Sequence, residues 1–492
     1  MTATPASVWD GGRREQLMVA ALAVTLVLLR SVVPTVYEGF YFDSDQAIVG
    51  LMAKHLSAFE RFPLFYYRLN YILGVEAWII APFFWMARPS VTVMRVPLVA
   101  LNALVAVWII TALGRRLGLR PLVAFVAALP FIMPAPVVAS QLLETAGACV
   151  EPFVYILLLW RLRNRPLAFG AVLAVGFLHR EFTVFAVPAI LILEAARGEG
   201  WDRDNLRRAA LVAAAFGLVW LVVDAIRLRQ SGVSLGLQAL SLSRQVCTDP
   251  GEWGGRAVSV VTEALPVLFG GTFTRLQDFR MNTPVTAGSA VVGWMVALAI
   301  GGMAARLVWS WFRGPRVSAS DGFPIYLALV GAFTACAYPL SCNVIPGWPP
   351  ILRYLLLGLL LPIGCCAAFM QRERSRPLRT AAAGVFVLWA AVNLADNVRL
   401  IRTSVKTPPL SVHRVLADYL VSHQIRYARA IYWDAYAVDF LSRERVIVAA
   451  VDLVRIPECQ QRVDEHAASA VIIQRIPCTG GERVAGWCVK QP

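Results

Sequence analysis

The sequence predicts a polytopic α-helical membrane protein with about eleven transmembrane helices, followed by a small α/β domain. Hydrophobic residues make up 58% of the 492 residues and charged residues only 16%, and the mean hydropathy is +0.61. A soluble multi-domain protein is rarely so apolar. Long apolar runs alternate with short arginine clusters up to Thr403, and beyond it the composition becomes that of an ordinary globular chain.

The net charge of +15 does not indicate nucleic acid as a partner. The arginines lie in short clusters between apolar runs, which is the distribution that the positive-inside rule requires. We therefore expect them to face water and anionic lipid head groups. Arg13 and Arg14 precede an apolar run without a small-residue cleavage site. They predict an uncleaved anchor with the N-terminus in the cytoplasm, in a multi-pass protein of the cytoplasmic (inner) membrane.

The first span is expected at Leu17 to Val33, so the chain emerges outside before Asp43. The next apolar run, Tyr71 to Met86, contains Pro82. It is too short to cross the membrane, because a crossing needs about 20 apolar residues. We expect it to be a helix that is embedded in the outer leaflet or folded back on itself, within a first external loop over 34–92. The other spans are expected near 93–113, 121–139, 147–160, 167–178, 182–194, 209–223, 286–303, 323–340, 353–370 and 380–396.

This assignment divides the chain into a transmembrane domain, 1–403, and an extracytoplasmic α/β domain, 404–492. In the second domain, strand-like runs at Ala428–Trp433, Arg445–Ala449 and Ala470–Gln474 alternate with helical stretches such as Val412–His423. Cysteines that fall outside the spans can form disulfides, although sequence does not determine their pairing. They are Cys247, Cys342, Cys459, Cys478 and Cys488.

Two acids begin the first polar stretch after the first span. From Ser44 to Leu56 the apolar residues recur at helical spacing, which predicts an amphipathic helix on the membrane surface. Asp43 stands at the N-cap position with Gln46 three residues on, as in a capping box. Asp45 is then left without a structural role, and it is our first candidate for a general base or a cation ligand. Helix capping and solvation are the simpler alternative for both acids.

Two other acids and one tyrosine are further candidates. Glu76 lies in an apolar run, where a charge is costly and is often functional, although it could extend to the surface. Tyr67 ends an aromatic segment that could form a half-desolvated pocket around the aspartates. Glu144 follows Gln141 in a short external turn, where solvation is the simpler explanation.

Basic residues occur at two points where spans are expected to end. His179, Arg180 and Glu181 join two short spans, and such a polar junction is tolerated where it lines a cavity or faces water. A guanidinium at Arg180 matches a phosphate bidentately. Arg353 and Tyr354 stand at the outer end of a later span and offer the same chemistry. The alternatives are a solvated loop for the first group and interface anchoring for the second.

No phosphate-binding loop, His-Glu-x-x-His pattern, Cys-x-x-Cys pair or Gly-x-Ser-x-Gly elbow occurs in the sequence. These absences argue against a nucleotide-driven pump and against a metal hydrolase.

Residues 20–120 resemble the N-terminal signature of bacterial membrane glycosyltransferases of the GT-C superfamily. The branch is that of the dolichyl-phosphate-mannose protein mannosyltransferases and lipid A aminoarabinose transferases, which are glycosyltransferase family 39-like. The resemblance is carried by Phe42-Asp-Ser-Asp-Gln-Ala-Ile-Val-Gly-Leu-Met-Ala-Lys-His55, Phe62-Pro-Leu-Phe-Tyr-Tyr67, Gly74-Val-Glu-Ala-Trp78 and Pro89-Ser-Val-Thr-Val-Met-Arg-Val-Pro97. Where relatives show Tyr-Gly-Gln, this chain has Tyr67-Arg68-Leu69-Asn70.

The resemblance implies transfer of a sugar from a polyprenyl-phosphate donor to an acceptor outside the membrane, with inversion at the anomeric carbon. It implies that an acid of the first external loop acts as base or positions the acceptor, a role that falls on Asp45 first and Asp43 second. It also implies that Arg180 and Arg353 hold the lipid phosphate. The donor and the membrane are thus expected partners. The acceptor could be a glycan, a lipid or a protein, and a divalent cation could assist the acids.

Two other functions remain open at this point. A lipid or solute transporter, such as a flippase, would show paired halves with interrupted helices in both, and this sequence has one interrupted pair. A non-catalytic relative would use its external domain to bind envelope components.

Overall fold

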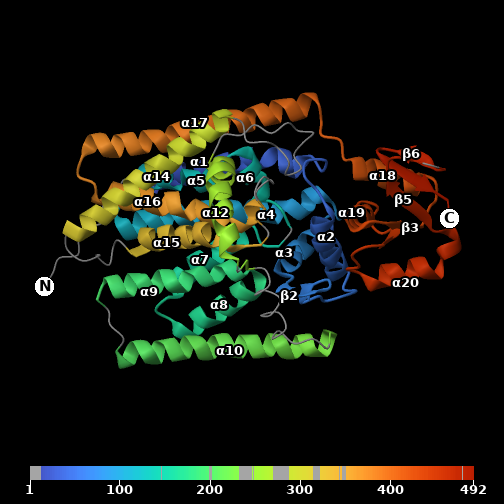
Figure 1. The fold of residues 1–492 in the computed structure, drawn as a ribbon, viewed down its shortest axis with the longest axis horizontal. Helices are drawn as coiled ribbons and strands as arrows, with labels where there is room; N and C mark the ends of the chain where they lie inside the picture. Colours follow the sequence, from blue (N-terminus) through green and yellow to red (C-terminus); the bar gives the residue numbers. More distant parts are fainter. Residues whose placement is uncertain are drawn as a thin grey trace.

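Helices make up most of the chain, and each of the eleven predicted spans contains one in the computed structural model (Figure 1). The structure describes residues 13–145, 147–198, 202–231, 246–247, 249–269, 287–313, 322–342, 344–345, 351–478 and 480–491. About half of residues 224–284, between the spans expected near 209–223 and 286–303, lie outside the described residues. The span helices are α1 (Arg13–Val36), α4 (Val91–Leu117), α5 (Pro121–Ile132), α7 (Glu151–Leu162), α8 (Pro166–His179), α9 (Ala186–Ala196), α10 (Arg203–Ser231), α14 (Ala287–Arg313), α15 (Gly322–Ala337), α16 (Leu360–Arg372) and α17 (Arg376–Lys406).

Six of the described helices are long and apolar enough to cross a membrane by themselves, and α5, α8 and α16 are shorter apolar helices. Local sequence explains several boundaries. The Ser90 hydroxyl accepts a hydrogen bond from the amide of Val93 and caps α4. Gly118 ends the same helix in the left-handed conformation, at φ 63°. Prolines begin α5 and α8, where a missing amide hydrogen costs little.

The span helices enclose one large apolar core. Within it α15 packs on α16, α1 on α4, and α5 on α16. Helix α10 packs on α8 at the edge of the bundle, as Figure 1 shows, and most of its surface is exposed. A short helix, α6 (Pro136–Gln141), follows α5 and leads into the buried turn before α7.

Residues 34–92, which were predicted to be a first external loop, form two helices and a hairpin. These are α2 (Ser44–Ser57), β1 (Phe65–Tyr66), β2 (Leu69–Leu73) and α3 (Val75–Met86). The strands pair antiparallel, so Tyr71 belongs to a strand and the predicted helix over Tyr71 to Met86 begins only at Val75. Helix α2 forms where the apolar spacing predicts it, but nearly all its residues are buried. The expectation that one face lies free on a surface is wrong, because protein covers α2 on several sides.

The C-terminal part contains a five-stranded sheet in the order β4-β3-β5-β7-β6. Strand β3 pairs parallel with β4 and β5, and β7 pairs antiparallel with β5 and β6. Its elements are α18 (Val412–Ser422), β3 (Tyr427–Ala430), α19 (Tyr432–Leu441), β4 (Ile447–Ala450), α20 (Pro457–Glu465), β5 (Val471–Arg475), β6 (Glu482–Val484) and β7 (Trp487–Lys490). The three predicted strands and the first helix are confirmed. The first strand is shorter than expected, because Tyr432 already begins α19.

The C-terminal sheet and its helices share one apolar cluster with the first external loop, at one end of the molecule (Figure 1). Helix α19 packs on α2 so closely that a Cβ added at Gly50 would lie 2.5 Å from the Phe440 ring. The Arg414 guanidinium donates to both carboxylate oxygens of Glu38, at 2.7 and 2.9 Å. At the other end of α2, the Lys54 ammonium pairs with Glu444. The two parts are therefore fitted together and not merely tethered.

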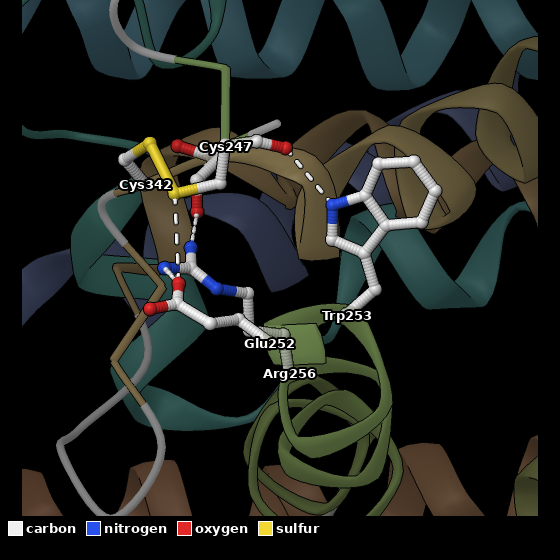
Figure 2. The surroundings of a disulfide bond; sticks show 6 residues. Cys247, Glu252, Trp253, Arg256 and Cys342 are labelled. Atoms are coloured by element: carbon white, nitrogen blue, oxygen red, sulfur yellow. Dashed lines mark hydrogen bonds and ion pairs between the residues drawn. A yellow bond between two sulfur atoms is a disulfide. The ribbon is translucent and has the colours of Figure 1, made fainter. Parts of the chain in front are cut away.

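Two disulfides join cysteines from segments that were predicted to lie outside, namely Cys247–Cys342 and Cys478–Cys488. Figure 2 shows the first bond, beside α12 (Pro250–Ser259). Arg256 of α12 donates to the carbonyl of Ser341 and pairs with Glu252, and Trp253 donates to the carbonyl of Cys247 (Figure 2). These contacts attach the segment that begins α12 to the chain that follows α15, a short distance before Arg353.

We expect Gly39→Ala to weaken the attachment of the C-terminal part. A Cβ at Gly39 would lie 2.4 Å from the carbonyl oxygen of Pro409, so main chain must move to admit it. Overpacking of this kind costs about 1–3 kcal/mol. The variant should unfold at a lower temperature in detergent and be cleaved faster near residues 407–411. Gly384→Ala in α17, where a Cβ meets nothing within 4 Å, is the matched control, and equal stability of the two variants would contradict the expectation.

Candidate active site

The turn before α2 is held by one buried arginine. The Arg95 guanidinium, from α4, donates to the carbonyl oxygens of Pro34, Phe40 and Tyr41 and to the side-chain oxygen of Gln46, the last at 3.0 Å. A planar guanidinium can serve several acceptors at once. The turn contains a left-handed residue, Tyr41, at φ 51°. Arg95 therefore determines where α2 begins.

Asp43 caps α2 as predicted, because its carboxylate accepts a hydrogen bond from the amide of Gln46 at 3.1 Å. The reciprocal half of the capping box is not made. The Gln46 side chain donates instead to the carbonyl of Tyr41 and accepts from Arg95. Burial, with the negative charge of Asp45 adding to it, raises the pKa of Asp43 to about 6.

Asp45 lies at the junction of three distant parts of the chain. Its Oδ1 accepts a hydrogen bond from the Tyr432 hydroxyl of α19, and its Oδ2 lies 3.6 Å from a guanidinium nitrogen of Arg353. The Tyr66 hydroxyl donates to its main-chain oxygen. The Asp45 side chain remains 25% exposed, so a substrate group can reach it. The view that Asp45 has no structural contacts is wrong, although none of its contacts closes the carboxylate from solvent.

Arg353 and Tyr354 connect Asp45 to the helix junction. The guanidinium carbons of Arg353 and Arg180 lie 5.4 and 5.8 Å from the centroid of the Tyr354 ring, within the range of cation–π attraction. Phe182 meets the same ring edge-on, at 5.7 Å. The predicted break between two short helices is present, because Arg180 adopts an extended conformation between α8 and a turn that begins at Glu181. One tyrosine ring thus brings the two predicted phosphate-binding arginines together.

Glu76 and Arg180 meet at the turn before α7. The Glu76 carboxylate is buried and accepts hydrogen bonds from the amides of Gly147 and Ala148, at 3.2 and 2.6 Å. The Arg180 guanidinium lies against Gly147, where an added Cβ would come within 2.6 Å of it. Gly147 also has φ +95°, which favours glycine. This turn therefore positions both the Glu76 carboxylate and the Arg180 guanidinium of the candidate site.

Glu144 is buried, at 3% exposure, and the expectation of a solvated turn is wrong. One of its oxygens accepts from the Tyr41 hydroxyl at 3.5 Å, and the other has no hydrogen-bond partner among the described residues. Burial, with the negative charge of Asp43 adding to it, raises the pKa of Glu144 well above its usual range. Glu144, a candidate for which solvation was the simpler explanation in the sequence, thus lies near the aspartates.

Two of the candidate site residues, Tyr67 and His179, have their contacts away from Asp45. The Tyr67 hydroxyl contacts Nδ1 of His55 at 2.8 Å, and the other ring nitrogen of His55 contacts Glu444 at 3.0 Å. This places Tyr67 in the contact with the C-terminal part, while its neighbour Tyr66 reaches Asp45. His179 is buried at the end of α8 and contacts the hydroxyl of Tyr155 on α7, at 3.0 Å.

A small cavity of about 50 Å³ adjoins Tyr354. Its volume suits one or two water molecules and not a sugar. Neither aspartate lines it. Its walls are formed by Glu181, Phe182, Phe185, Thr334, Ala337, Tyr338, Ser341 and Tyr354. In the described part of the chain, no group of three or more His, Cys, Asp or Glu side chains is arranged to hold a metal ion.

Three residues of this arrangement were missed in the sequence. Arg95 had a usable signal, since a charge within an apolar span is costly and commonly has a buried partner. Tyr66 had a weak one, because it adjoins Tyr67 in the aromatic segment. Tyr432 had none, since it lies 387 positions from Asp45 and only the tertiary fold joins them.

The fold resembles those of membrane glycosyltransferases. The crystal structure of ArnT from Cupriavidus metallidurans bound to undecaprenyl phosphate matches with a TM-score of 0.62 and 11% identity, covering 96% of this chain and 97% of that one. The apo oligosaccharyltransferase of Archaeoglobus fulgidus matches at 0.49 and 14% identity, covering 94% and 70%, and apo ArnT at 0.45 and 11%, covering 96% and 97%. No protein-family profile and no curated protein matches the sequence.

ArnT has the GT-C fold. The match to ArnT runs over nearly the whole of both chains and includes the C-terminal part. The expected likeness to GT-C proteins, which in the sequence rested on residues 20–120, is therefore confirmed for the fold of the whole chain.

We expect Asp43→Asn to remove the loss of folding stability that the ionisation of buried Asp43 causes as the pH rises. Because the folded-state pKa of Asp43, about 6, exceeds its unfolded value, the folded wild type loses stability as the pH rises from about 4 to 6. Asparagine also caps helices well. The variant should therefore gain about 3 kcal/mol relative to wild type at pH 7 and little at pH 4. Thermal unfolding in detergent at both pH values measures this, and a gain of equal size at both would contradict it.

Proposed function

We propose that this chain transfers a sugar from a polyprenyl-phosphate-linked donor to an acceptor at the outer face of the cytoplasmic membrane, with inversion at the anomeric carbon. The observation that carries the proposal is the pairing of Asp45 with Arg353, beside Tyr354 and Arg180, in a chain with the fold of ArnT. ArnT was crystallised with undecaprenyl phosphate. A polyprenyl phosphate on the donor supplies a leaving group that needs cations and no added acid.

In this mechanism Asp45 accepts the proton of an acceptor hydroxyl while the acceptor oxygen attacks the anomeric carbon. The bond between that carbon and the phosphate oxygen breaks, and the polyprenyl phosphate leaves with its negative charge. Arg353 and Arg180 stabilise that charge, since a guanidinium binds phosphate bidentately. Asp43, which caps α2 two residues before Asp45, is the second candidate for the acceptor side.

The buried acids support this site. Glu76 fixes the turn against which Arg180 lies, and Glu144 adds negative potential beside the aspartates. Tyr354 aligns the two guanidinium groups. The aromatic side chains around Glu181 supply a dry wall next to the phosphate-binding arginines. Water exclusion at this point strengthens the attraction between the arginines and the phosphate.

The topology that goes with this function has the N-terminus in the cytoplasm and the C-terminal domain, 404–492, outside. Two observations support it. The arginine clusters follow the positive-inside pattern under this arrangement. Both disulfides then lie on the side where oxidising conditions prevail. The acceptor on that side is a glycan, a lipid or a protein.

We expect Asp45→Asn to abolish transfer without affecting insertion into the membrane. Loss of a general base lowers kcat by about 10²- to 10⁴-fold. The assay incubates the purified chain in lipid nanodiscs with a panel of labelled polyprenyl-phosphate sugars and identifies the glycosylated products. Asp464→Asn is the matched control, because Asp464 pairs with Arg429 on the surface of the C-terminal part. Transfer at the wild-type rate by Asp45→Asn would remove Asp45 from the mechanism.

We expect Arg353→Lys to weaken donor binding more than it slows turnover. A lysine ammonium keeps the charge but lacks the planar fork that matches phosphate, and the two residues are not interchangeable at such sites. KM for the donor should rise by about tenfold. Retention of labelled undecaprenyl phosphate by the purified variant gives an independent measure. Arg429→Lys serves as control, and unchanged KM and retention in Arg353→Lys would exclude Arg353 from the phosphate site.

A further inference from the structure

Tyr432 is the contribution of the C-terminal part to the candidate active site. It is the first residue of α19, it is 3% exposed, and its hydroxyl donates to Oδ1 of Asp45. Its amide donates to the carboxylate of Asp452 in the loop after β4, at 2.6 Å. The Arg455 guanidinium carbon lies 5.8 Å from its ring centroid. Contacts within the C-terminal part, to Asp452 and Arg455, thus hold Tyr432 independently of its contact with α2.

The contact between α19 and α2 places this hydroxyl on Asp45. The amide of Ala437 donates to the Ser44 hydroxyl at 3.2 Å, and the Phe440 ring packs against Gly50. Further along the same two segments, His55 contacts Glu444. Contacts along the length of α2 therefore determine the register of α19 against it. A shift of one helical turn would move Tyr432 by about 5 Å and break its bond to Asp45.

The two oxygens of Asp45 have different partners. Oδ2 faces Arg353 at 3.6 Å, a long contact, and Arg353 also has a proposed task at the donor phosphate. Oδ1 faces the neutral Tyr432 hydroxyl. When Arg353 engages a phosphate, the bond from Tyr432 is the contact that still orients the carboxylate. The charged and titratable groups around Asp45 are Arg353, Asp43, Glu144, Tyr66 and Tyr432.

We propose that Tyr432 is a positioning residue for the transfer reaction, so that the C-terminal domain forms part of the active unit. Its hydroxyl holds Oδ1 of Asp45, and Oδ2 is left to take the proton of the acceptor hydroxyl. Tyr432 keeps its own proton throughout, since it orients the base and does not exchange a proton with the substrate. This inference rests on the proposed function of Asp45 and adds a requirement that the fold alone does not impose.

Tyr432→Phe tests the inference, because it keeps the ring and deletes the hydroxyl. We expect kcat to fall by about 10- to 100-fold, while KM for donor and acceptor changes by less than about threefold. The acid limb of the kcat–pH profile should also move to higher pH, since a carboxylate that loses a hydrogen-bond donor holds its proton more tightly. Tyr419→Phe is the matched control, because the Tyr419 hydroxyl contacts Glu482 on the exposed surface of the same domain.

A second variant guards against simple loss of folding. Replacement of Tyr432 by 3,5-difluorotyrosine keeps the shape and makes the hydroxyl a stronger donor, so the acid limb should move to lower pH. Opposite shifts in the two variants support the inference, because damage to packing cannot produce both. A wild-type pH profile in both variants, with transfer intact, overturns the role of Tyr432 and leaves the proposed function standing. Absence of transfer by the wild-type chain with every donor overturns the proposed function itself.

Discussion

The carboxylate of Asp45 is the point at which the three parts of this molecule meet. The segment 34–92 supplies the acid, the segment before α16 supplies Arg353, and the C-terminal part supplies Tyr432. Each partner occupies a different oxygen, so the carboxylate is oriented from two sides and remains accessible on a third. A charged group held in this way needs little reorganisation when a substrate arrives. The docking of the C-terminal part on α2 is therefore a condition for the geometry of the site.

Main-chain groups compensate two other buried charges near this site. Arg95 donates to three carbonyl oxygens, and Glu76 accepts from two amides. Removing a charge from water costs several kcal/mol unless hydrogen bonds replace the lost solvation. Here the replacement also shapes the chain, because two of the carbonyls, those of Phe40 and Tyr41, belong to the turn before α2, and the amides belong to the turn beside Arg180. The same bonds thus stabilise the charges and position the candidate catalytic groups.

Much of the fold follows from patterns within single segments. Apolar runs of sufficient length predict the eleven span helices, and alternation between strand-like and helical runs predicts three of the strands after residue 404. The N-cap at Asp43 and the break at Arg180 were also visible, since each depends on a few neighbouring residues. The burial of α2 on several sides was not visible in the sequence. Its apolar spacing predicted a helix with one covered face, and whether α19 or a membrane covers the rest depends on segments nearly 400 positions away.

Residue types and local spacing by themselves determined the membrane class and the positions of the helices, and they singled out Asp45, Arg180 and Arg353 as candidate site residues. Tertiary structure alone decided that Tyr66 and not Tyr67 reaches Asp45, that Glu144 is buried, and that Tyr432 completes the site. The reason is physical. Helix formation depends on contacts a few residues apart, whereas the partner of a carboxylate is set by the packing of whole elements, in which a displacement of one residue turns a side chain to the opposite face.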